Sequence, residues 1–138
     1  MATRNPYRHI LTTALMIATM TPGRVEARYY NPDAKECHAL AKQAHQLGWP
    51  RRELPTLRRI AARESLCSNL ALNPRDPHGG SHCAMQINGS NRGFLQRERI
   101  IRKDIAELRA SPTKCLKAAL ALWKRHGWRP WAGASSAP

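Results

Sequence analysis

The chain has 138 residues and a formal net charge of +14, with 23 lysines and arginines against nine acids. This length suits one domain with a small core. Such a charge indicates either an anionic partner or only a well-solvated basic surface. The sequence contains no RNP motif, zinc finger or basic-region zipper that would indicate a specific nucleic-acid-binding protein.

The first 27 residues have the pattern of a secretory signal peptide. Arg4 and Arg8 form a basic region, the apolar stretch 10–20 follows, and cleavage is predicted after Ala27. The apolar stretch is too short to span a bilayer, which argues against a stable membrane anchor. A transit peptide is the alternative, because the segment contains arginine and is nearly free of acids.

Removal of residues 1–27 leaves 111 residues, a net charge of +12 and four cysteines. An even cysteine count in a small exported chain indicates two disulfides, with three possible pairings. We therefore expect a secreted monomer, or a periplasmic one in a Gram-negative host. Anionic cell-wall polymers are the polyanions most available to such a protein.

Two helices are predicted in the first half of the mature chain. Asp33 is a suitable N-cap for a helix over residues 34–47, which Gly48 ends. Pro55 fits the first turn of a second helix, which carries Glu64 near its C-terminal end.

A short hairpin and further helices are predicted in the second half. Turn residues and an alternating run indicate a β-hairpin over 70–88, with 81–88 as one strand. The apolar pattern of residues 94–109 predicts one or two short helices. Ser111 is a suitable N-cap for a last helix over 113–126. The fold class is therefore α+β, mainly α.

Glu64 is the candidate catalytic residue. It lies on the same helical stripe as Leu57, Ile60 and Ala61, so it points toward the core or a cleft beside it. A carboxylate there is unfavourable unless it is used. The alternative is a structural glutamate paired with Arg63 or another cation.

Four segments together resemble c-type lysozymes and lytic transglycosylases. They are Glu64-Ser65, Ala71-Leu72-Asn73, Cys83-Ala84-Met85-Gln86-Ile87-Asn88 and the ending GWRPW at 127–131. The resemblance implies a lysozyme-like fold over residues 28–131, with a small β-hairpin beside the catalytic helix. The small, polar composition of 132–138 predicts a flexible tail. The resemblance also implies cleavage of the β-1,4 bond between MurNAc and GlcNAc in peptidoglycan glycan strands, without a cofactor or metal.

The resemblance also assigns roles to individual residues. Glu64 would act as general acid and then as base. Substrate-binding positions would be Ser65, Met85, Gln86, Asn88 and Trp131, with Met85 either facing the groove or packing beneath it. Gln86 and Asn88 have an alternative role as turn residues, because asparagine before glycine commonly sets a turn.

Departures from the family pattern favour one reaction. Ser81 stands where c-type lysozymes carry a second carboxylate, and Asp76 is the only acid in the hairpin region. A retaining hydrolase needs that second group. Lytic transglycosylases use one Glu together with the acetamido group and 6-hydroxyl of the sugar, so we expect that reaction. A muramidase and an inactive binding protein are the alternatives, the latter because the late Tyr-Asn pair of many transglycosylases is missing.

The cysteines fit the same picture. A Cys67–Cys83 bridge would tie the catalytic helix to the hairpin, and Cys37–Cys115 would join the first and last helices. Cys83 also replaces the usual glycine of the family motif, a loss of backbone freedom that a disulfide would offset. A zinc site with His78 and His82 is disfavoured, because His82 and Cys83 would point to opposite faces of a strand.

Overall fold

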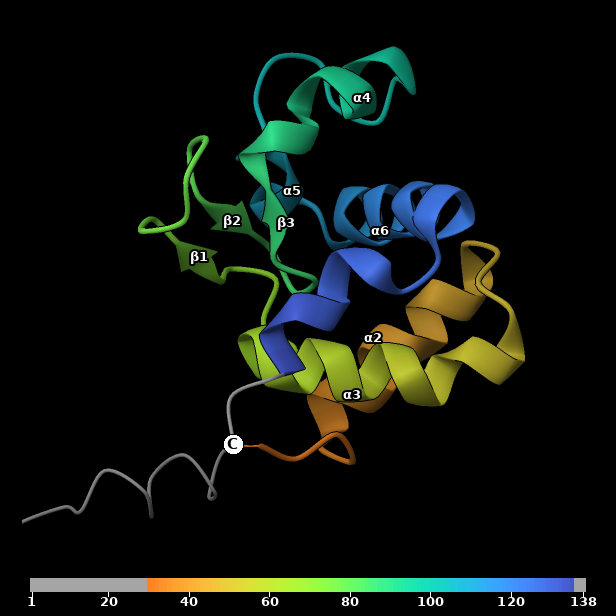
Figure 1. Cartoon of the computed structure of the whole chain (residues 1–138). Helices are drawn as coiled ribbons and strands as arrows, with labels where there is room; N and C mark the ends of the chain where they lie inside the picture. The colour runs from red at the N-terminus through yellow and green to blue at the C-terminus, as the bar shows by residue number, and fades with distance from the viewer. Residues whose placement is uncertain (1–29, 136–138) are drawn as a thin grey trace, which may run out of the picture.

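The computed structural model describes residues 30–135, so the predicted signal peptide 1–27 lies outside the described residues. This part of the chain is mainly helical with a small antiparallel sheet, which confirms the α+β class (Figure 1). In chain order the elements are α2 (Lys35–Gln46), η1 (Arg51–Glu53), α3 (Leu54–Ser65), β1 (Leu72–Asn73), β2 (Ser81–His82), β3 (Ile87–Asn88), η2 (Gly89–Asn91), α4 (Arg92–Arg97), α5 (Glu107–Ala110), α6 (Pro112–His126) and η3 (Arg129–Ser135).

The helices form one body with the sheet at its side. α2 packs against α3, and α6 contacts α2, α5, β3 and η3. Figure 1 shows the sheet beyond the C-terminal end of α3, with α4 on the far side of the molecule from α2 and α3. η3 reaches Ser135, so the first part of the predicted tail 132–138 is a 3-10 helix.

Helix α3 begins and ends where the sequence predicts. Pro55 occupies its first turn, and its buried positions are Leu57, Ile60, Ala61 and Ala62. The helix ends because Leu66 and Cys67 both adopt left-handed backbone conformations, with φ of 55° and 62°. Each costs roughly 1–2 kcal/mol in a residue other than glycine. The chain thus reverses directly after Glu64-Ser65.

Of the two predicted helix caps, Ser111 is confirmed and Asp33 is wrong. Ser111 caps α6, since its hydroxyl accepts a hydrogen bond from the Lys114 backbone N–H at 3.2 Å. Asp33 does not cap α2, whose N-cap is Ala34 without a side-chain hydrogen bond. The Asp33 carboxylate instead accepts from the Arg58 guanidinium at 3.1 Å, a contact that joins α2 to α3.

The predicted hairpin is a three-stranded sheet in the order β1-β2-β3. Prediction of 81–88 as one strand is wrong, because a turn at 83–86 separates β2 from β3. Cys83 and Gln86 have φ of 67° and 47° there, which an extended strand cannot accommodate. β3 then folds back antiparallel to β2, with Ser81 opposite Asn88.

All four cysteines form disulfides, but the predicted pairing is wrong. Cys37 bonds Cys67, which ties α2 to the left-handed end of α3. Cys83 bonds Cys115, which ties the 83–86 turn to α6. The Cys67–Cys83 and Cys37–Cys115 pairs do not form, because the reversal after α3 brings Cys67 against α2. Cys83 stands where the family motif has glycine, and it has the left-handed conformation that glycine adopts readily, with φ of 67°. Its disulfide to Cys115 forms in that conformation.

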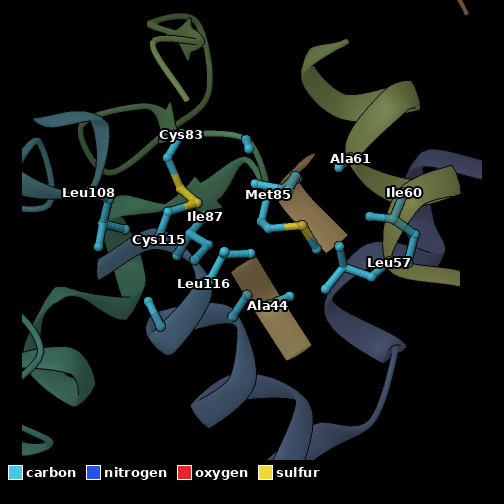
Figure 2. Packing of buried hydrophobic residues seen from close by; sticks show 14 of the residues in the cluster. Ala44, Leu57, Ile60, Ala61, Cys83, Met85, Ile87, Leu108, Cys115 and Leu116 are labelled. Atoms are coloured by element: carbon cyan, nitrogen blue, oxygen red, sulfur yellow. A yellow bond between two sulfur atoms is a disulfide. The ribbon is translucent and has the colours of Figure 1, made fainter. Parts of the chain in front are cut away.

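The core lies between α2, α3, α6 and the 83–86 turn. Met85 is completely buried and lies among Leu57, Ala61 and Leu116 (Figure 2). All four tryptophans pack together at the other side of the core. Trp128 contacts the other three rings, and the buried Trp49 donates from its indole N–H to the Leu116 carbonyl at 3.2 Å.

Glu107 organises the loop before α5. Its Oε1 accepts from the backbone N–H groups of Arg102, Lys103 and Asp104, and its Oε2 accepts from the Lys114 ammonium. These contacts, led by the Lys103 N–H, lower the pKa of Glu107 from its usual 4.5 to about 2.

The lowered pKa predicts an acid dependence of stability that Glu107→Gln removes. A depressed pKa contributes stability that is complete above about pH 4.5 and is lost as the pH falls to about 2. The melting temperature of Glu107→Gln should therefore fall less steeply than that of wild type over this range. Glu36→Gln, at an exposed position on α2, is the matched control and should follow wild type. Parallel profiles for all three proteins would contradict the assignment.

Residues 30–135 lack two kinds of feature. No helix there is long and apolar enough to cross a membrane. No group of three or more His, Cys, Asp or Glu side chains within these residues is placed to hold a metal ion.

Candidate functional site

Glu64 lies in the last turn of α3, and 16% of its side chain is exposed. Arg63 donates to its Oε1 from Nε at 3.0 Å and from Nη2 at 2.7 Å. Among residues 30–135, no hydrogen bond is formed with Oε2. The carboxylate is therefore shielded, and Arg63 orients it through one oxygen.

Arg63 also reaches the C-terminal segment. Its Nη2 donates to the Trp131 carbonyl at 2.8 Å. The guanidinium thus joins the candidate acid on α3 to η3. Because charge-assisted hydrogen bonds are strong, this contact favours one orientation of Glu64.

Three of the motif segments meet at the backbone of residues 84 and 85. The Ser65 hydroxyl lies 2.7 Å from the Ala84 carbonyl and 3.0 Å from the Ala61 carbonyl. The Trp131 indole N–H donates to the Met85 carbonyl at 2.7 Å. The end of α3, the 83–86 turn and the GWRPW segment therefore form one connected structure beside Glu64.

This arrangement gives several predicted substrate-binding residues structural roles. Met85 is fully buried, so it packs beneath the site, the second of its two predicted positions. The Ser65 hydroxyl is used within the protein. Trp131 is 5% exposed, which leaves little of its ring for stacking on a sugar.

Gln86 and Asn88 make the contacts expected of turn residues. The Gln86 side-chain amide donates to the Cys83 carbonyl at 3.1 Å and closes the 83–86 turn. Asn88 donates to the Pro77 carbonyl at 2.8 Å, and its side-chain oxygen accepts from the Ser90 N–H at 2.9 Å. Both side chains are half-buried, so Gln86 keeps some surface for a ligand while both ends of the Asn88 amide are engaged.

The positions considered for a second carboxylate are both structural. Ser81 is 4% exposed, and its hydroxyl lies 3.4 Å from the Asn88 amide nitrogen. Asp76 accepts from the Asn73 amide at 3.0 Å within the turn between β1 and β2. The described site therefore presents Glu64 without a carboxylate partner built into the sheet.

Comparison with known proteins assigns the chain to no family. No family model, curated protein or solved structure matches it. The lysozyme-like resemblance stays a prediction that rests on the motifs and on where the structure places them.

A groove of about 760 Å³ is lined by Arg63, the residue that binds Glu64. One wall is an α3 stripe of Thr56, Arg59, Ile60 and Arg63, and the rest includes Trp128, Arg129 and Trp131. The sequence interpretation missed this groove. Spacing of three and four residues between positions 56, 59, 60 and 63 was the available signal, since it places them on one face of a helix.

The Trp131–Met85 hydrogen bond predicts the effect of Trp131→Phe. Phenylalanine keeps an aromatic ring but removes the donor, which leaves the buried Met85 carbonyl unsatisfied. We expect a loss of about 1–3 kcal/mol in the free energy of unfolding, measured by urea denaturation and circular dichroism. Trp128→Phe is the control, because its N–H donates to Glu53 in a less buried place and its loss should be smaller. Equal losses would contradict this role for Trp131.

Proposed function

We propose that this protein cleaves the β-1,4 bond between MurNAc and GlcNAc in peptidoglycan as a lytic transglycosylase, with Glu64 as its single acid and base. The observation that carries the proposal is the convergence of the Glu64-Ser65, 83–88 and GWRPW segments on the Ala84–Met85 backbone. Sequence matches that were accidental would have no reason to meet at one site.

In the proposed reaction, Glu64 gives its proton to the glycosidic oxygen as the bond to the MurNAc anomeric carbon breaks. The acetamido oxygen of the sugar bonds that carbon in the meantime. Glu64, now a base, takes the proton of the 6-hydroxyl, whose oxygen displaces the acetamido group. The product carries a 1,6-anhydro ring, and no water is consumed.

The described carboxylates favour this reaction over hydrolysis. A retaining hydrolase needs a second carboxyl group about 5 Å from the first. Ser81 occupies the corresponding position and is buried, and Asp76 is held in a turn. A muramidase is thus the less favoured form of the same proposal.

A non-catalytic, basic wall-binding protein is the second candidate. The specific observation in its favour is the ion pair between Arg63 and Glu64, at 2.7 Å. The guanidinium occupies Oε1 of Glu64, as it would in a purely structural ion pair. In the proposed enzyme, the glycosidic oxygen must therefore approach Oε2 rather than Oε1.

The proposed location is outside the cytoplasm. Two disulfides are typical of proteins from oxidising compartments, and peptidoglycan lies there. The predicted signal peptide also supports export.

Incubation of the mature protein with purified peptidoglycan, followed by mass analysis of released fragments, tests the proposal. Anhydro-muramyl ends are the expected result. Reducing ends would support the muramidase instead. Binding to the wall without soluble fragments would contradict both enzymatic forms and support the wall-binding protein.

A further inference from the structure

The groove beside Arg63 is basic and partly apolar. Arg59, Arg63 and Arg129 line it, and none of its described lining residues is acidic. Ile60, Trp128 and Trp131 supply apolar surface between the cations. Its volume of about 760 Å³ lies within the usual range for organic ligands.

Two of these cations are exposed and bonded to neutral groups. Arg59 donates to the Thr56 hydroxyl at 3.1 Å, and Arg129 donates to the His126 carbonyl at 3.2 Å. Neither forms a salt bridge with an acid of residues 30–135. These contacts orient the two guanidinium groups without neutralising them, which suits recognition of a carboxylate.

Arg63 connects the groove to the proposed reaction. It lines the groove and also donates to Glu64. A ligand in the groove therefore lies against the same guanidinium that binds Glu64. A glycan chain is uncharged along its sugar backbone, so the cations require another, anionic part of the same substrate.

We infer that this groove binds the carboxylate-bearing peptide branch of peptidoglycan, so that strands carrying peptides are the preferred substrate. The inference rests on the proposed function. The arginines contact the carboxylates of the branch, and Trp128 packs against its methyl groups. The groove thereby selects which sugar of the strand enters the site.

Cleavage kinetics of two substrates test this inference. One substrate is intact glycan strand, and the other is the same strand with its peptide carboxylates converted to amides, which removes their charge. Arg59→Gln with Arg129→Gln should raise KM for the intact strand by about fivefold, since two exposed charge contacts are lost. The KM for the amidated strand and both kcat values should not change.

The matched control is Arg99→Gln with Arg102→Gln, which removes the same charge from exposed positions in the segment after α4. It should leave both KM values at the wild-type level. An unchanged KM in the groove variant, or the same rise in the control, would overturn the inference while leaving the proposed function intact. Failure of the wild-type protein to cleave either strand would instead contradict the proposed function, and this inference with it.

Discussion

Replacing Glu64 with glutamine is expected to lower the release of peptidoglycan fragments by about 10³-fold while the fold is retained. The amide has nearly the same shape and its oxygen can still accept from Arg63, but it can neither give nor take the required proton. Release of soluble muropeptides over time measures the effect, and circular dichroism checks the fold.

Glu36→Gln is the matched control for this variant, because it removes the same charge from an exposed position on α2. Its rate should equal that of wild type. If wild type and Glu64→Gln release fragments at the same rate, Glu64 is a structural partner of Arg63 and the proposed mechanism is wrong.

Removing the Cys83–Cys115 disulfide is expected to have a large effect on stability. The bridge spans a sequence separation of 32 residues, so loss of its constraint on the unfolded chain costs about 3–4 kcal/mol. Small domains have only about 5–15 kcal/mol in total. The double variant Cys83→Ala with Cys115→Ala should therefore show a much lower urea midpoint, and the 83–86 turn should lose its attachment to α6.

The other bridge provides the comparison. Cys37→Ala with Cys67→Ala opens a similar separation of 30 residues and should cost a similar free energy. Peptide mapping of the unreduced protein gives the pairing directly. A fragment that links Cys67 to Cys83 would contradict both assignments.

Helices α3 and α6 could be predicted from local chemistry. Pro55 and the stripe through Leu57 and Ile60 indicate α3, and the side chain of Ser111 caps α6. Such signals depend on neighbours within one or two turns of the chain. For that reason the position of Glu64 at a helix end was also predictable.

The 83–86 turn could not be predicted in the same way. Residues 81–88 alternate in polarity, but Cys83 and Gln86 adopt left-handed conformations that contacts within and beyond the turn stabilise. One of those contacts is the disulfide to Cys115, which is distant in sequence. The pairing of Cys67 likewise depends on the reversal after α3, and no local pattern encodes it.

The candidate site was predicted in outline but not in its contacts. The motifs identified Ser65 and Trp131 as neighbours of Glu64, and the structure brings Ser65 and Trp131 to the Ala84–Met85 backbone. Their polar atoms support the site rather than face a ligand. The interpretation could not foresee this, because a motif identifies which residues come together but not where each side chain points.

The central claim is that Glu64 cleaves the glycan without a water molecule. Digestion of purified peptidoglycan in water enriched in ¹⁸O, with mass analysis of the new ends, tests it most directly. The account predicts 1,6-anhydro ends that contain no ¹⁸O. New ends that each carry one ¹⁸O, or the absence of released fragments, would contradict it.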